Sequence, residues 1–387
     1  MNITHEQISD LLLEIANKEN GTQVLMKMAL EALMKSERSL HRIDFPEDYA
    51  NGFRTRKVTG YGKEMALQVP RTRSGAFYPV LLNVLRDEDE ERRKLLFSLY
   101  RKGLTTEQVC DVYEELYGKN YSKQQVSYLM KESRQEIHLW LSRDLESHYL
   151  VLYIDAIFVH TRRDQSVSKE GYYSILGVKE DGTREVLSIV NHPTEGALLW
   201  EQELQNLKDR GVESVGLIVS DGLSGIENSI VKSFPNARHQ LCVVHAKRNI
   251  LNTFPLKLRP QISLELQEVF TIETSHSSQI QGYEKLCSFV SKWEKRYPSL
   301  KSYLRPRNTA FFTYLEFPAS IQRMIYSTNW VERLHKDYRR VLKMRGALPS
   351  AESAIALMGA VSMEKGDKTY KYPVWAFRDI DELKRKK

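Results

Sequence analysis

The sequence has little cysteine and no long hydrophobic run. Its 387 residues contain three cysteines, Cys110, Cys242 and Cys287. An odd, widely spaced set of this kind argues against a disulfide framework and against a four-cysteine zinc module. The apolar runs near Leu150 and Val215 are far shorter than a membrane span, and the N-terminus has no signal-peptide pattern. We therefore expect a cytoplasmic protein with no membrane partner.

The sequence carries an excess of basic residues, and the excess is unevenly distributed. Lysine and arginine outnumber aspartate and glutamate by 57 to 50, which gives a formal net charge of +7. Over so long a chain this is only weak evidence for a polyanionic partner.

The length allows two to four domains. Residues 1–50 have apolar side chains at helical spacing, which predicts an N-terminal helical region for oligomerisation or for binding a DNA end.

Residues 51–90 form a basic stretch that the sequence predicts to be a β-ribbon. Six cations face a single acid, Glu64, between Asn51 and Gly75, and side chains alternate between apolar and polar around Leu67. Cations on strands can neutralise the phosphates of a DNA backbone. A solvated surface ribbon is the alternative. The candidate DNA contacts are Arg54, Arg56, Lys57, Arg71 and Arg73.

Residues 91–146 have the pattern of a helix-turn-helix domain. One helix ends at Gly103, Thr105 or Thr106 caps a second, and Ser122 caps a third. Small helices joined by short turns suit insertion into the major groove. A plain three-helix packing module is the alternative. On the third helix the candidate contacts to phosphates or base edges are Lys123, Gln124, Gln125, Ser127 and Tyr128.

The pattern of residues 147–254 predicts an α/β core. Strand candidates at 150–159, 172–178 and 184–190 come first, and the last two form a hairpin around Gly182. A helix, a strand ending at Asp221, a second helix and a short strand at 238–243 follow. Antiparallel strands followed by alternating helices and strands predict a mixed sheet with helices on its faces.

Three carboxylates stand out against this background. Asp155 interrupts an apolar β-type run, Asp221 ends another, and Glu332 lies in a basic helix. Burying an unpaired carboxylate is costly, so the three suggest a shared cation, most simply a pair of Mg²⁺ ions. Each has an alternative: a structural hydrogen bond for Asp155, a turn or N-cap for Asp221, and for Glu332 a capping box with Asn329 or an ion pair with Lys336.

Four short motifs in this order resemble a known family. They are Ile154–Ala156, Ser220–Gly222, Cys242–His245 and Tyr326–Leu334. Together they are similar to DDE transposases with a ribonuclease H-like core, and more narrowly to the Mutator-like class of bacterial insertion-sequence transposases. The resemblance extends from about residue 51 to residue 349. One departure is Trp330, where the family commonly has alanine or serine.

The resemblance implies roles for the residues of these motifs. Asp155, Asp221 and Glu332 would be the catalytic residues and the ligands of two Mg²⁺ or Mn²⁺ ions, with Asp155 shared between them. Cys242 and His245 would support the site from behind the ligands. Residues 255–318, which have helical periodicity, would be an all-helical insertion, and residues 319–387 the last core helix and a basic tail. Arg339, on the helix of Glu332, is our candidate for a phosphate contact.

The function implied is transposition of an insertion sequence. Such an enzyme binds double-stranded DNA at terminal inverted repeats, cleaves it, and joins it to target DNA by metal-dependent phosphoryl transfer. The resemblance also implies a homodimer or higher oligomer and a copy-out/paste-in route. Two alternatives remain, namely a ribonuclease H-like nuclease or junction resolvase without strand transfer, and a DNA-binding regulator.

Overall fold

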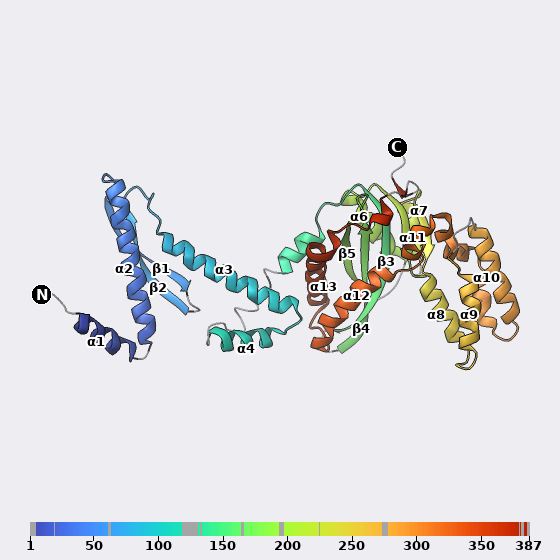
Figure 1. The fold of residues 1–387 in the computed structure, drawn as a ribbon, viewed down its shortest axis with the longest axis horizontal. Helices are drawn as coiled ribbons and strands as arrows, with labels where there is room; N and C mark the ends of the chain where they lie inside the picture. Colours follow the sequence, from blue (N-terminus) through green and yellow to red (C-terminus); the bar gives the residue numbers. More distant parts are fainter. Residues whose placement is uncertain are drawn as a thin grey trace. The chain divides into compact units, whose positions relative to one another are not determined.

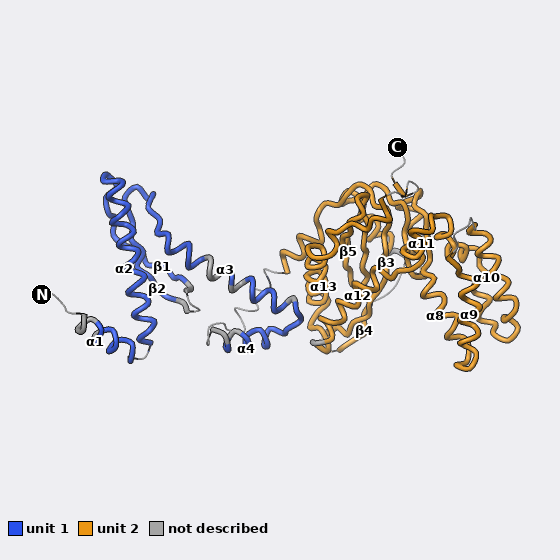
Figure 2. The backbone as a smooth tube through the Cα atoms, viewed as in Figure 1, with its two compact units in different colours: residues 1–131 blue, residues 132–387 orange. Residues whose placement is uncertain are grey.

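The computed structural model divides the chain into two compact units, Met1–Lys131 and Glu132–Lys387 (Figure 2). It describes residues 5–18, 20–60, 63–117, 131, 134–163, 166–192, 197–223, 225–272, 278–378, 380 and 383–384. Each unit is described here by itself. Within these residues, no helix is both long and apolar enough to cross a membrane.

The first unit is built around a β-hairpin and one long helix. Helix α1 (His5–Ala16) is followed by α2 (Gly21–Asp44), and strands β1 (Ala50–Gly60) and β2 (Lys63–Thr72) pair antiparallel. The alternation expected in β2 is confirmed, because Met65, Leu67 and Val69 are buried and the residues between them are exposed. These three side chains pack with Leu30 and Met34 of α2 into a small core.

Two further helices complete the described part of this unit. Helix α3 (Val80–Arg101) ends before Gly103, whose φ of 101° is a conformation that favours glycine. Helix α4 (Thr106–Tyr117) begins with reciprocal hydrogen bonds between Thr105 and Gln108, at 2.9 and 3.2 Å. The capping role predicted for Thr105 is therefore confirmed. The predicted third helix, with Lys123 to Tyr128, lies outside the described residues.

The second unit contains the predicted mixed sheet. Its five strands are β3 (His148–Arg163), β4 (Ser166–Val178), β5 (Arg184–His192), β6 (Ser214–Ser220) and β7 (Arg238–Leu241), in the order β5-β4-β3-β6-β7. Strands β3, β4 and β5 are antiparallel neighbours, whereas β6 and β7 run parallel to β3. The long strand β3 is therefore central and borders both halves of the sheet.

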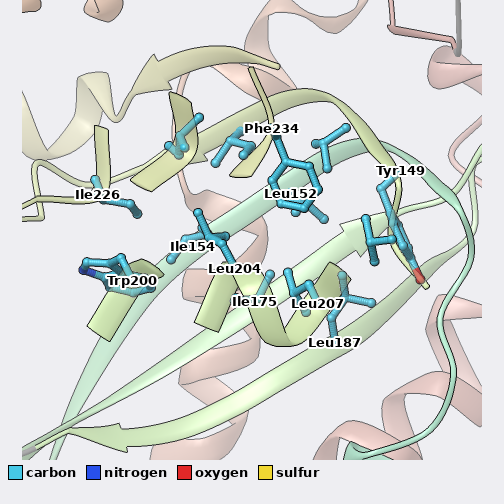
Figure 3. Close-up of a cluster of buried hydrophobic side chains, with 14 of the residues drawn as sticks. Tyr149, Leu152, Ile154, Ile175, Leu187, Trp200, Leu204, Leu207, Ile226 and Phe234 are labelled. Carbon is cyan, nitrogen blue, oxygen red and sulfur yellow. The ribbon is translucent and has the colours of Figure 1, made fainter. Parts of the chain in front are cut away.

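Helices cover both faces of this sheet (Figure 1). On one face α6 (Ala197–Asp209) and α7 (Ile226–Ser233) bury Trp200, Leu204 and Ile226 against Leu152 and Ile154 of β3 (Figure 3). On the other face lie α12 (Asn329–Leu342) and α13 (Ala351–Lys365), which contact β3, β4 and β5. The sequence did not lead us to expect α13, whose apolar residues lack a clear helical stripe because nearly all its sides are buried.

Helical segments separate β7 from α12. They are α8 (Val243–Thr253), α9 (Arg259–Val269), α10 (Gln279–Trp293), the 3₁₀ segments η1 (Pro298–Leu304) and η2 (Pro306–Glu316), and α11 (Ala319–Ile325). The helical character expected for residues 255–318 agrees with the described elements. Segment η2 lies along β7, where the Gln240 amide donates to Phe311 O at 2.9 Å and its oxygen accepts from Tyr314 N at 2.6 Å. This covers an otherwise open sheet edge.

The chain ends in short helical segments that pack back onto the second unit. They are η4 (Gly366–Tyr370) and η5 (Trp375–Phe377), whereas the short segment η3 (Lys343–Arg345) lies between α12 and α13. Further on, Leu383 is fully buried, and its carbonyl oxygen lies 2.8 Å from His148 Nε2 at the start of β3. Part of the region predicted as a basic tail therefore contributes to the core.

Candidate active site

Strand pairing brings Asp155 and Asp221 together. Ile154 of β3 lies opposite Ser220, the last residue of the parallel strand β6. Asp155 and Asp221 follow these two residues directly, so they lie at the same end of two adjacent strands. Asp155 is 6% exposed, whereas the Asp221 side chain is 38% exposed. The centre thus has one carboxylate set into the sheet and one at its rim.

Asp221 lies in a turn, as one of the predicted alternatives proposed. Its Oδ1 accepts a hydrogen bond from Gly222 N at 2.8 Å, and its carbonyl oxygen accepts one from Leu223 N at 2.7 Å. The second carboxylate oxygen, Oδ2, lies 3.5 Å from His245 Nδ1. The turn therefore fixes the backbone of Asp221 and leaves one carboxylate oxygen facing the site.

Cys242 connects three parts of the site. It precedes α8 and is 1% exposed, and its backbone N–H donates to Ser220 O at 2.8 Å. Thr328, at the start of α12, directs both its N–H and its hydroxyl at Cys242 Sγ, at 3.5 and 3.4 Å. The cysteine therefore holds the start of α8 against the end of β6 and the start of α12. Whether Cys242 also supports catalysis, as the resemblance implies, stays a prediction.

His245 lies between the carboxylates, closer than the sequence suggested. Its Nδ1 is 3.5 Å from Asp221 Oδ2, and its Nε2 is 3.2 Å from Glu332 Oε1. The pKa of His245 is raised to about 9, first by its side-chain hydrogen bond with Cys242 and then by the negative charges of Asp221 and Asp155, which outweigh the effect of burial. Ligand atoms of Asp155, Asp221 and His245 all lie within 4.8 Å of one another.

Glu332 reaches this centre from the first turn of α12. The capping-box alternative is wrong, because Thr328 rather than Asn329 is the N-cap and no side-chain capping bond forms there. The Glu332 backbone N–H instead donates to Thr328 O at 2.9 Å, and its carboxylate contacts His245. Val331 and Leu334 are buried on the other side of the helix, which turns Glu332 toward the carboxylates of the sheet.

The three carboxylates line a common pocket of about 820 Å³. Exposed basic side chains surround it, among them Arg339, which the sequence singled out. A pocket lined by both carboxylates and basic side chains suits a metal ion together with a phosphate group. The cations in the pocket wall are Arg248, Arg333, Lys336 and Arg339.

Comparison with known proteins identifies the family. The model of the Mutator family of transposases matches residues 3–372 of this chain. The chain belongs to the Mutator family of transposases. Several relatives are named as transposases of insertion sequence elements. The transposase of insertion sequence element IS1201 from Lactobacillus helveticus is 31% identical over 314 residues, which cover 81% of this chain and 84% of the relative.

Two further relatives extend the match across most of this family member. The transposase of IS905 from Lactococcus lactis is 31% identical over 78% of this chain and 76% of its own length. The transposase of IS256 in transposon Tn4001 from Staphylococcus aureus is 27% identical over 94% of each chain. Both units of the Mutator-family chain therefore fall within the matched length.

Two residues at the site of this Mutator-family member, Arg248 and His335, were not among the predicted site residues. Arg248 lies one turn after His245, and His335 lies one turn after Glu332, so helical spacing could have indicated both. Trp330 has a structural partner, because the Arg184 guanidinium lies 4.5 Å from its ring centroid. The tryptophan departure is thus a packing feature close in sequence to Glu332.

The basic residues predicted on the β-ribbon lie at the surface of the first unit. These five residues are all exposed: Arg54, Arg56, Lys57, Arg71 and Arg73. Helix α2 adds cations beside them: the Arg38 guanidinium donates to Gly52 O and Arg71 O at 3.1 and 3.3 Å and lies over the Phe53 ring. Arg38 therefore braces the hairpin whose other cations remain exposed.

Proposed function

We propose that this chain is a DDE transposase with a ribonuclease H-like core. It binds the terminal inverted repeats of an insertion sequence, cleaves one strand at each end, and transfers the resulting 3′-hydroxyl to target DNA. Its membership of the Mutator family supports transposition as the overall activity. The convergence of Asp155, Asp221 and His245 with Glu332, on four separate elements, is the observation that carries the chemistry.

The donor atoms at this centre fit divalent cations. The three carboxylates provide the hard oxygen ligands that Mg²⁺ and Mn²⁺ prefer. Glu332 Oε1 and His245 Nδ1 are buried, and neither has a hydrogen-bond partner in the part of the chain that is described. Asp155, Asp221 and Glu332 would hold two ions, with Asp155 shared. When bound, such ions stabilise the charge of a phosphoryl-transfer transition state and activate water.

The protein groups would contribute positioning and charge. Cys242 and Thr328 fix α12 against the sheet, so the Glu332 carboxylate faces the two aspartates. Arg339 and Arg248 would hold the DNA phosphates on either side of the scissile bond by guanidinium hydrogen bonds. Cleavage adds water to the phosphodiester and releases a 3′-hydroxyl. Transfer forms a new bond from that hydroxyl to a target phosphate and expels the target's own 3′-oxygen.

The first unit would recognise the DNA end. Exposed arginines on the β-hairpin suit a phosphate backbone, and helices α3 and α4, joined by a short turn at Gly103, are consistent with a helix-turn-helix arrangement. Lys123, Gln124, Gln125, Ser127 and Tyr128 remain candidates for base contacts. Action as a homodimer or higher oligomer, through a copy-out route, completes the proposal and rests on the family relationship.

A strand-transfer assay tests this proposal. The full chain is incubated with a terminal-repeat duplex that ends in a free 3′-hydroxyl, a supercoiled target plasmid and Mg²⁺ or Mn²⁺. We expect joined products with the wild-type chain and none with Asp221→Asn, which removes one ligand charge but keeps the side-chain size.

Other outcomes would assign a different function. Cleavage of uncut ends without joining would favour a ribonuclease H-like nuclease or resolvase. End binding with neither cleavage nor joining, in both metals, would favour a DNA-binding regulator. The convergence of the carboxylates argues against that last reading, because a decayed core has no need to keep them together.

A further inference from the structure

His335 is a buried imidazole that has no hydrogen-bond partner among the described residues. It lies on α12, one turn after Glu332, and is completely buried. Neither of its ring nitrogens makes a hydrogen bond to any residue that the structure describes. Leaving a buried polar atom unpaired costs about 1–3 kcal/mol, so such a group in a native protein needs an explanation.

An acceptor lies just beyond hydrogen-bond reach of this ring. His335 Nδ1 is 3.6 Å from Asp155 Oδ2. The ring packs on Tyr338 with centroids 5.7 Å apart, and the buried Leu334 precedes it on the helix. A movement of about half an ångström would bring the two atoms to the usual N–H···O distance. The Asp155 carboxylate, at 6% exposure, has little solvent available as a substitute.

We propose that His335 positions Asp155 for metal binding by donating its Nδ1–H to Asp155 Oδ2. The inference rests on the proposed function, because it takes Asp155 to be a metal ligand. A hydrogen bond at Oδ2 would fix the carboxylate rotamer and leave Oδ1 free to bind a cation. Carboxylates that bind metals are generally oriented by an outer hydrogen bond of this kind, and its loss typically costs 10–100-fold in metal affinity.

The proposal gives α12 two linked tasks. Glu332 faces His245 at 3.2 Å, and His335, on the next turn, faces Asp155 at 3.6 Å. One rigid helix would therefore set the position of its own carboxylate and the orientation of the carboxylate on β3. The unpaired imidazole is then a stability cost that is offset only when Asp155 is drawn into its metal-binding position.

Metal binding and stability, measured on the same full-length variants, separate this role from a packing role. His335→Phe keeps a ring in the cavity but removes the donor. We expect about 10–100-fold weaker Mn²⁺ binding by calorimetry. The midpoint of urea unfolding without metal should be unchanged or higher, because an unpaired polar group is gone. A packing role predicts the reverse, with a lower midpoint and unchanged Mn²⁺ affinity.

Two amide variants test which ring nitrogen donates the hydrogen bond to Asp155. They remain informative even if the phenylalanine variant fails to fold. The amide nitrogen of His335→Asn can reach the place of Nδ1, whereas that of His335→Gln extends toward the place of Nε2. We expect Mn²⁺ affinity close to wild type for Asn and a loss like that of Phe for Gln. In cleavage assays the affected variants should need more Mg²⁺ for half-maximal rate and recover most of their rate at saturating Mg²⁺. Equal Mn²⁺ affinities for Asn and Gln would overturn the proposal.

Controls separate failure of this inference from failure of the proposed function. Tyr338→Phe removes another buried polar group of the same helix, whose hydroxyl lies 2.6 Å from Ser362 Oγ. It should lower stability and leave Mn²⁺ affinity unchanged. If Asp155→Asn loses Mn²⁺ binding but His335→Phe does not, only the positioning role is wrong. If Asp155→Asn binds Mn²⁺ as the wild type does, the metal site itself is wrong.

Discussion

The two units of this transposase-family chain bury their side chains very differently. In the first, one described cluster contains seven buried apolar residues between α2, α3 and the hairpin, and the described side chains of residues 51–57 are all exposed. In the second, a cluster of sixteen buried apolar residues packs α6 and α7 onto one face of the sheet, and α12 and α13 cover the other.

This difference matches what each unit is proposed to do. Contacts to DNA phosphates need exposed charge and tolerate small displacements, so a thin scaffold is sufficient. Carboxylates that share metal ions must be held to within about half an ångström, which requires rigid elements supported on all sides. Asp155 is therefore buried within the large second unit, whereas Arg54 and Arg56 lie on a strand whose described side chains are mostly exposed. The four predictions below separate these two kinds of region.

The largest effect is expected for Asp155→Asn. Loss of this charge removes several kcal/mol of transition-state stabilisation, so cleavage should fall by about 1,000-fold or more. Binding of a terminal-repeat duplex should stay within about twofold, since the hairpin arginines that we propose to contact phosphates are far from Asp155 in sequence and lie in the other unit. Gel-shift and single-turnover cleavage assays measure the two effects. Persistent cleavage at the wild-type rate would show that the assignment of the metal ligands is wrong.

Core truncations in the two units should affect separate unfolding transitions. Leu204 on α6 and Leu67 on β2 are both fully buried. Replacing either with alanine should cost about 2–5 kcal/mol in the unfolding free energy of its own unit. Differential scanning calorimetry should report two transitions, one lowered by each variant. A single transition lowered by both would mean that the units unfold cooperatively as one body, and the comparison would fail.

The double variant Arg54→Ala/Arg56→Ala should weaken DNA binding without slowing the chemistry. These exposed side chains are two residues apart on β1 and so lie on the same face. Loss of two phosphate contacts should make the slope of log K against log salt shallower by about 2. The cleavage rate on saturating DNA should remain near wild type. Lys232→Ala, which removes an exposed cation of the second unit, is the matched control and should leave the slope unchanged.

The smallest effect concerns the pH dependence of the first unit. Hydrogen bonds from the Ser74 hydroxyl and backbone, at 2.6 and 2.9 Å, lower the pKa of Asp48 well below its usual value of 3.8. A pKa lower in the folded than in the unfolded state stabilises the fold above pH 3.8, and this stabilisation is lost as the pH falls through the folded value.

Asp48→Asn should therefore lower the urea midpoint of the first unit at pH 7, and the difference from wild type should shrink below about pH 4. Asp44→Asn, at an exposed carboxylate at the end of α2, is the control and should have little effect at either pH. A difference for Asp48→Asn that does not change with pH would contradict the role given to its charge.

Much of the core of this chain was predictable from local patterns. Apolar runs at residues 150–159 and 215–221 predicted β3 and β6, and Thr105 with Gly103 predicted the boundary between α3 and α4. These signals are local because strand alternation, caps and left-handed glycines depend on neighbouring residues. Helix α13 escaped prediction because a helix buried on nearly all sides has no polar face to reveal its period.

The sequence by itself determined the mixed sheet and the places of Asp155 and Asp221 on or after its strands, since each is marked by its immediate neighbours. Only the tertiary structure decided that His245 lies between Asp221 and Glu332 and that Thr328 contacts Cys242. It also decided that His335 is buried close to Asp155. These contacts join residues from separate strands and helices. Their distances depend on how α8 and α12 pack against the sheet, which no local pattern encodes.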